Sequence, residues 1–214
     1  PKHESIAHFN LAAMQVARAQ NPALDFSNIP LDDRPTYDLL ARGDTTGIPP
    51  LEGITMRCLL RRQAPRNLLQ LLRVKTEAGN ARGDASASRE VSGELPDVLL
   101  SYQCTFLKAN FPLAFYGAAI GSVVGGRGNP AALVRAARRA GHELRAPDIN
   151  LSDWDTTLQG GSIRLGLAAV KGFGERAWEH LKEIRSSGSF ETLAEFFECL
   201  ERPAGADFLE VFPR

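Results

Sequence analysis

The feature that most constrains this chain of 214 residues is a series of segments in which apolar residues recur at helical spacing. A proline or a glycine ends most of these segments, and both residues commonly mark a helix boundary. The segments are residues 4–20, 33–43, 51–65, 67–74, 98–121 with a break at Pro112, 129–141, 175–188 and 192–200. The pattern predicts a mainly α fold.

Two of these helices carry explicit start and stop signals. Asp33 is a favourable N-cap for a helix that ends at Gly43. Asn129 is expected to cap the helix over 129–141, with Pro130 at its first position and Gly141 at its end. We expect both helices to form as bounded units.

Two other regions depart from the helical pattern. At residues 159–161 the letters "QGG" predict a hairpin turn, and "SIRLGL" at 162–167 alternates like a strand. Residues 76–97 are rich in glycine, serine and charged residues, which predicts a polar linker that divides the chain.

The composition limits the partners that this chain attracts. Its 25 basic and 25 acidic side chains cancel, so any contact with nucleic acid must come from a local patch. Cys58, Cys104 and Cys199 are far apart and form no CxxC pair, so we expect no zinc or redox centre and a cytoplasmic setting. The scattered histidines predict no metal site, and no apolar run approaches the length of a membrane span.

Six arginines lie on the outward faces expected for two helices. The helix over 51–65 is expected to bury Ile54, Cys58 and Leu59 and to expose Arg57, Arg61 and Arg62, and the later helix to expose Arg135, Arg138 and Arg139. Such faces are most simply solvated surfaces, and the alternative is a lining for a DNA groove.

Two further patterns have simpler structural explanations. An acidic group of Asp32, Asp33, Asp38 and Asp44 invites comparison with a two-metal site, but helix capping and turn formation account for most of it. The letters "GGRGNPAAL" at 125–133 resemble a dinucleotide-binding loop, but no strand precedes them.

The strongest candidate site is a glycine-rich turn directly before a helix. The order of a helix-hairpin-helix turn is matched by Val170, Lys171, Gly172, Phe173, Gly174 and Ala177. Arg176, just after the turn, is a further candidate for DNA contact. Glycines there let successive backbone N–H groups point outward beside a helix N-terminus, where a DNA phosphate accepts from them. Such contacts do not read base sequence. The alternative is a plain turn in which the glycines supply unusual φ values.

Five stretches in this order resemble the bacterial DNA polymerase III alpha subunit, the C-family DNA polymerases. They are "IPLDDRPTYDLLARGDTTG" (29–47), "LEGITMRCLLRRQAP" (51–65), "LLSYQCTFLKANFPLAF" (99–115), "APDIN" (146–150) and "IRLGLAAVKGFGE" (163–175). The resemblance implies a helical fingers-like bundle, then a short β hairpin and a helix-hairpin-helix that binds DNA.

The resemblance also implies a division of the chain. Residues 1–75 correspond to a fingers-like segment with a palm remnant at its start, residues 76–97 to the linker, residues 98–145 to a second fingers-like segment, and residues 146–214 to the β element with the helix-hairpin-helix.

Several parts of the family have no counterpart here. The palm aspartates that hold magnesium are missing, and if "HFNLAAM" is a palm remnant, Asn10 stands where a catalytic aspartate belongs. The glutamine-bearing fingers segment appears as "PPLEG", and the arginine-proline-glycine element is absent. We therefore expect no catalytic residues, no cofactor and no polymerase activity from this chain alone. The partners expected are DNA and other replication or repair proteins, and the alternative is a scaffold module without DNA contact.

Overall fold

The structure, a computed structural model, describes residues 11–18, 22, 25–26, 28–80, 91–123, 130–185, 188–192 and 194–196. The helices are α2 (Arg34–Ala41), α3 (Ile54–Gln63), α4 (Leu68–Asn80), α5 (Val91–Asn110), α6 (Pro112–Val123), α7 (Ala131–Arg139) and α8 (Glu175–Arg185), with 3₁₀ turns η1 (Pro49–Leu51) and η2 (Leu167–Ala169). Residues 11–18 are also helical, and the rest of the helix predicted over 4–20 lies outside the described residues. The expected mainly α fold is confirmed.

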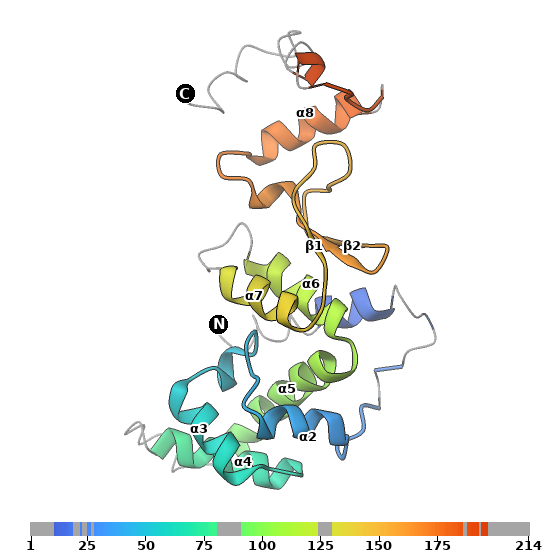
Figure 1. The fold of residues 1–214 in the computed structure, drawn as a ribbon. Coiled ribbons are helices and arrows are strands. Elements are labelled where there is room, and N and C mark those ends of the chain that lie inside the picture. Colours follow the sequence, from blue (N-terminus) through green and yellow to red (C-terminus); the bar gives the residue numbers. More distant parts are fainter. Residues whose placement is uncertain are drawn as a thin grey trace.

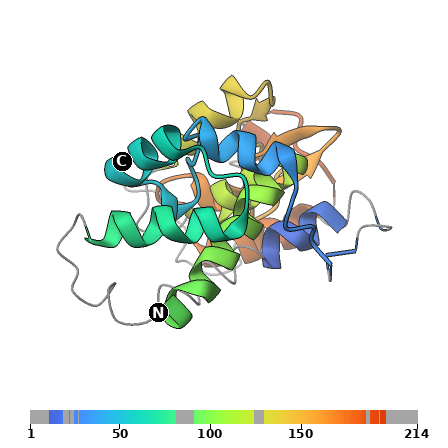
Figure 2. The ribbon, with the colours of Figure 1, turned by 90° about the horizontal axis from the view of Figure 1, so that it is seen from below.

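The elements follow one another along the molecule. Figure 1 shows α2 to α5 at one end, α6, α7 and the strands in the middle, and α8 at the opposite end. Contacts join α2 to α5, α3 to α4, α4 to α5, α5 to α6 and α6 to α7. Seen from below in Figure 2, the helical residues 11–18 lie on the side away from α3 and α4.

A first hydrophobic cluster holds α2 to α7 together. Among its fully buried side chains are Leu40, Leu51, Leu60, Leu71, Tyr102, Leu107, Phe115 and Ile120. The cluster takes residues from both sides of the predicted linker. Those two parts of the chain therefore share one core.

The predicted linker over 76–97 is wrong at both ends. Helix α4 continues to Asn80 and α5 begins at Val91, while residues 81–90 lie outside the described part. Ala78 is buried in the first cluster, and Lys75 of α4 forms an ion pair of 3.2 Å with Asp97 of α5. Tertiary packing thus extends helices through residues whose composition favours a linker.

Helix α2 starts and stops where the sequence predicts. The N–H of Thr36 donates to Asp33 Oδ2 at 2.9 Å, as an N-cap requires. Tyr37 and Leu40 are buried, and Gly43 follows the helix with a φ of +65°. The left-handed conformation at that position favours glycine.

Helix α3 buries a different face from the predicted one. Ile54 is 83% exposed and Cys58 is exposed, whereas Leu59 is buried as expected. The other buried residues are Met56 and Leu60. Both sets fit helical spacing, but the observed one removes more apolar area from water because it includes two leucines and a methionine.

The later helices mostly begin and end at the prolines and glycines that predicted their boundaries. Helix α5 ends at Asn110 and α6 begins at Pro112, as predicted. Gly141 follows α7 with a φ of +85°. Pro130, expected at the first helical position, is the N-cap, and the predicted cap Asn129 lies outside the described residues.

A three-stranded sheet lies between the two ends of the molecule. Its strands are β1 (Leu144–Arg145), β2 (Thr157–Gln159) and β3 (Ser162–Arg164), in the order β1-β3-β2. Strand β1 is parallel to β3, and β2 is antiparallel to it. The predicted hairpin turn is present, with positive φ at Gly160 (55°) and Gly161 (80°).

A second hydrophobic cluster lies around α8. It consists of Leu167, Phe173, Ala177, Trp178, Leu181 and Phe190. The N–H of Glu195 donates to Thr192 Oγ1 at 3.1 Å, which is half of the predicted capping box, and Glu195 accepts instead from the N–H of Glu191. Leu200 lies outside the described residues.

Candidate nucleic-acid interface

The candidate turn at residues 170–174, which we call the phosphate turn, is anchored by one aromatic side chain. Phe173 is only 8% exposed and packs in the second cluster, while its N–H donates to the carbonyl of Val170 at 3.0 Å. Gly172 has a φ of +86°, a conformation that L side chains rarely adopt. Phe173 and Gly172 together set the path of the backbone into α8.

The phosphate turn presents backbone donors at the start of α8. The first N–H of this region that donates to the helix ladder is that of Trp178, to the carbonyl of Gly174 at 3.1 Å. Within the described part of the chain, the N–H groups of residues 174–177 have no protein acceptor. Such groups form an anion site when the surface is open.

The surface is open at Gly174. A Cβ built there would meet nothing within 4 Å, and Gly174 is exposed. A bulky ligand can therefore approach the backbone of Gly174 without displacing any side chain.

The charges around the turn are mixed. Lys171 and Arg176 are exposed, and neither forms an ion pair with another described residue. Glu175 is exposed between them in the first turn of α8. Its carboxylate interacts favourably with the helix dipole but repels a phosphate. Because Lys171 and Arg176 outweigh the single charge of Glu175, the site has a modest net positive charge.

The element before the turn is shorter than a helix-hairpin-helix needs. It is the single 3₁₀ turn η2, where the N–H of Leu167 donates to the carbonyl of Asp153 at 2.9 Å. At Gly166 the backbone passes so close that an added Cβ would lie 2.2 Å from the carbonyl oxygen of Trp154. A glycine is therefore required directly before η2.

Two side chains that sequence analysis did not single out hold segments of the second cluster together. Arg185 donates to the carbonyls of Ile149 at 2.6 Å and Ser152 at 2.8 Å, and its guanidinium lies 5.4 Å from the Trp178 ring. Burial lowers the pKa of Arg185. The sequence signal available for Arg185 was its position seven residues after Trp178, which places both side chains on one face of the helix.

The second such side chain is Asn150, the last residue of the "APDIN" stretch. Its amide nitrogen donates to the carbonyl of Phe190 at 2.8 Å, and its amide oxygen accepts from the N–H of Phe190 at 2.9 Å. This stretch therefore has a structural role in holding Phe190 against the phosphate turn's cluster.

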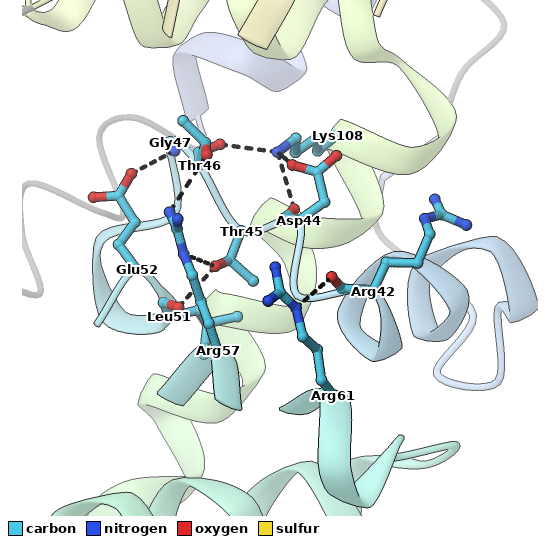
Figure 3. Close-up of polar contacts among 10 residues, drawn as sticks. All are labelled: Arg42, Asp44, Thr45, Thr46, Gly47, Leu51, Glu52, Arg57, Arg61 and Lys108. Carbon is cyan, nitrogen blue, oxygen red and sulfur yellow. Dashed lines mark hydrogen bonds and ion pairs between the residues drawn. The ribbon is translucent and has the colours of Figure 1, made fainter. Parts of the chain in front are cut away.

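A second polar arrangement lies in the first cluster, at residues 44–47, which we call the threonine loop. Lys108 is 3% exposed, and its ammonium donates to Asp44 Oδ1 at 2.7 Å and to the carbonyls of Asp44 and Thr46, both at 3.0 Å. Figure 3 shows the ammonium enclosed by these acceptors. Burial lowers the pKa of Lys108, while Asp44 opposes that shift.

The acidic residues of this region have structural partners. Asp33 caps α2, Asp44 pairs with Lys108, and Asp38 lies 3.9 Å from Arg34. Within the described residues, no group of three or more histidine, cysteine, aspartate or glutamate side chains is placed to hold a metal ion.

The six candidate arginines do not form one surface with the phosphate turn. Figure 1 places α3 and α8 at opposite ends of the molecule, with α7 between them. Arg62 is ion-paired with Glu77, whereas Arg57 and Arg61 point toward the threonine loop. On α7 the three arginines Arg135, Arg138 and Arg139 are exposed, as expected.

The fold and the site thus define a helical bundle joined to a short helix-hairpin-helix. Residues 8–76 match the bacterial DNA polymerase III alpha subunit finger domain, and residues 141–208 match the helix-hairpin-helix motif. The first match makes the chain similar to the bacterial DNA polymerase III alpha subunits in its finger region, and the second shows the motif alone. Apart from the ends of the linker, the division into four parts expected from the sequence stays a prediction.

Curated relatives point to the same family. The chain is 33% identical to DNA polymerase III subunit alpha of Caulobacter vibrioides over 48% of its own length and 9% of the relative. It is 36% identical to an error-prone DNA polymerase of Methylococcus capsulatus over 44% of its own length and 11% of the relative.

A longer alignment shows what separates this chain from its relatives. DNA polymerase III subunit alpha of Deinococcus radiodurans is 25% identical over 280 aligned residues, covering 80% of this chain and 21% of the relative. The aligned region is longer than this chain, so the relative carries residues there that the chain lacks. The chain spans about a tenth of the length of the first two relatives.

Hydropathy adds one finding. Among the described residues, the helices are too short or too polar to cross a bilayer.

Proposed function

We propose that this chain binds duplex DNA without sequence preference, through the phosphate turn and the first turn of α8. The observation that supports this most is the set of N–H groups at residues 174–177, which have no protein acceptor in the described part of the chain and stand beside the open surface at Gly174. N–H groups of this kind can donate to any phosphate of the DNA backbone, because every nucleotide carries the same phosphate group.

The proposed affinity is low and sensitive to salt. Lys171 in the turn and Arg176 in the first turn of α8 are exposed cations, and the whole chain carries no net charge. If both neutralise a phosphate, the logarithm of the binding constant falls with the logarithm of the salt concentration with a slope of about −2.

We further propose that the chain has no polymerase activity by itself and needs no magnesium to bind DNA. Its family matches cover finger-domain and helix-hairpin-helix regions. Phosphoryl transfer depends on positioned metal ions, and the sequence offers no counterpart to the palm aspartates that hold them. Primer extension by the purified chain in magnesium would contradict this.

The proposed setting is DNA replication or repair synthesis in the cytoplasm, alongside other proteins of those processes. The family and the cysteines, which are far apart in the sequence and form no CxxC pair, support this setting. A non-catalytic scaffold without DNA contact is the second candidate, and the zero net charge and Glu175 favour it.

Fluorescence anisotropy with a labelled duplex at low salt separates the two candidates. We expect Lys171→Gln with Arg176→Gln to weaken binding about tenfold or more, since each contact is a hydrogen bond to a charged group. Gly174→Val should have a similar effect, because its side chain would occupy the space that a phosphate needs.

The control is Arg34→Gln on α2, an exposed charge at the other end of the molecule. It should leave the affinity nearly unchanged. Equal affinities for all four proteins, or no binding by the wild type at low salt, would favour the scaffold.

A further inference from the structure

We propose that the open edge of β2, with the pocket beside it, binds a short extended segment of a partner protein that carries a basic side chain. Strand β2 is an edge strand, because the order of the sheet is β1-β3-β2. The sheet lies in the middle of the molecule, whereas α8 lies at its end (Figure 1). The inference does not depend on the function proposed for the phosphate turn.

A pocket of about 790 Å³ runs along this strand. One wall consists of residues 155–158 and of the two glycines in the hairpin turn. The other walls come from α6 and from the helical residues 11–18, which lie below the hairpin of β2 and β3 in Figure 1. Pockets of this volume are typical of ligand sites. There is thus room beside β2 for a bound segment of chain.

Strand β2 has backbone groups that its own sheet does not use. The N–H of Ile163 donates to the carbonyl of Glu143 at 2.9 Å, so the polar backbone groups of Ile163 point toward β1 and away from β2. Leu158 lies opposite Ile163 in the antiparallel pair. Hydrogen-bonded and non-hydrogen-bonded pairs alternate in such a ladder, so the N–H and C=O of Leu158 point to the open side of the sheet. An extended peptide that adds a strand to a sheet pairs with groups of this kind.

The strand and the loop before it are held in place by close packing. A Cβ at Gly117 of α6 would lie 2.9 Å from Leu158 Cδ2, so this glycine lets Leu158 pack directly on the helix. Before the strand, the carbonyl of Trp154 accepts from the N–H of Ala168 at 3.1 Å. A site that is fixed in advance loses less entropy when it binds a ligand.

Two polar groups of the pocket indicate what kind of segment fits. The hydroxyl of Thr156 is buried and has no hydrogen-bond partner within the described part of the chain, a cost that a polar ligand would remove. Asp155 is exposed and forms no ion pair or hydrogen bond with another described residue. Among the described residues that line the pocket, only Asp155 is ionisable. A basic side chain complements this charge, while Val16, Ala118 and Leu158 offer apolar contact to its neighbours.

The test begins with a selection of short random peptides on the immobilised full chain. The enriched peptides are then labelled and titrated by fluorescence anisotropy. We expect them to contain lysine or arginine beside β-branched residues, which favour extended strands. A bound peptide should slow hydrogen exchange at the amide of Leu158. The amide of Ile163 should not change, because its N–H already has an acceptor.

Gly121→Leu tests the pocket itself. A Cβ at Gly121 would meet only the side chain of Thr156, at 3.6 Å, which is ordinary contact, and the rest of the leucine would occupy the pocket. We expect peptide affinity to fall by at least about tenfold. Leucine favours a helix more than glycine does, so the variant should fold.

Asp155→Asn tests the charge. It should weaken peptide binding about threefold, as expected for an exposed ion pair. The matched control is Asp38→Asn, which removes the same charge from an exposed position on α2 and should leave the affinity unchanged. Asp155→Lys should abolish binding of the basic peptides, and replacing their basic residue by glutamate should restore it. This charge exchange keeps the inference testable if Gly121→Leu fails to fold.

Three results would overturn the inference. The first is a selection that enriches no peptide over a blank surface, and the second is an unchanged peptide affinity in folded Gly121→Leu. The third is self-association of the wild type that Gly121→Leu abolishes, because the occupant would then be a second copy of this chain. Lys171→Gln with Arg176→Gln should retain peptide binding, which separates a failure of this site from a failure of the phosphate turn.

Discussion

The threonine loop and the phosphate turn are held in opposite ways. At the threonine loop the contacts come from side chains, because the buried Lys108 ammonium holds Asp44 and the carbonyl of Thr46, and Arg57 donates to Thr45 and Thr46. At the phosphate turn the backbone path is set by the buried Phe173 and by Gly172, and the N–H groups of residues 174–177 have no acceptor among the described residues.

This difference predicts which substitutions each region tolerates. A loop held by side-chain contacts loses its geometry when a supporting partner is removed, because each hydrogen bond is made by a separate side chain. A turn defined by its backbone tolerates changes in surface side chains, but its donors are lost when the path of the backbone changes.

The largest effect is expected from Lys108→Met, which keeps most of the side-chain volume but removes the cation. It should lower the free energy of unfolding by about 3 kcal/mol, because the carbonyls that Lys108 satisfies would remain in a buried site. Urea denaturation measures this loss. Lys182→Met is the control, since Lys182 is half-exposed and its pair with Glu179 is on the surface, so its loss should be well under 1 kcal/mol.

The same variant sharpens the comparison between the two regions. In the folded protein it should leave DNA binding by the phosphate turn unchanged. Loss of that binding in a folded Lys108→Met protein would mean that the two regions are coupled.

A smaller effect is expected from Gly166→Ala. The added methyl group would lie 2.2 Å from the carbonyl oxygen of Trp154, so the backbone before η2 must move. Overpacking of this kind costs about 1–3 kcal/mol. Relative to the wild type, the variant should show a larger increase in hydrogen exchange in α8 than in α5. Gly174→Ala is the control, because a Cβ there meets open space.

The smallest effect concerns pH. Burial lowers the pKa of His142, whose Nε2 is buried without a hydrogen-bond partner in the described part of the chain, and whose ring contacts Tyr116. The unfolded chain therefore binds a proton more readily than the folded one. The stability that neutral His142 contributes is fully present above a pH of about 6.5, the ordinary pKa of histidine in the unfolded chain. It declines as the pH falls below that value.

His142→Phe keeps a ring beside Tyr116 and removes the titration. The wild type should lose more stability than this variant between about pH 7 and pH 5, as measured by urea midpoints. Parallel curves for the two proteins would show that His142 does not contribute.

Much of the fold could be predicted from the sequence, because its helices carry their own boundaries. Asp33 caps α2 with a side-chain acceptor, and Gly141 and Gly43 adopt the positive φ values that end helices. The "QGG" hairpin formed for the same reason, since its two glycines supply the conformation that a tight turn requires. These are local effects, decided within a few residues.

The errors arose where packing decided the outcome. Composition favoured a linker over 76–97, yet Ala78 is buried and the pair of Lys75 with Asp97 joins α4 to α5. Two faces of α3 had helical spacing, and contact with the neighbouring helices selected Met56 over Ile54.

The sequence by itself determined the ends of α2 and α7, the hairpin and the order of residues in the phosphate turn, because these depend on caps and on φ values of nearby residues. The tertiary structure decided which arginines have partners and which do not. Lys108 lies more than sixty residues from Asp44, and Arg185 more than thirty from Ile149. Contacts at such separations leave no periodic signal in one sequence, since they form only when the two hydrophobic clusters bring the segments together.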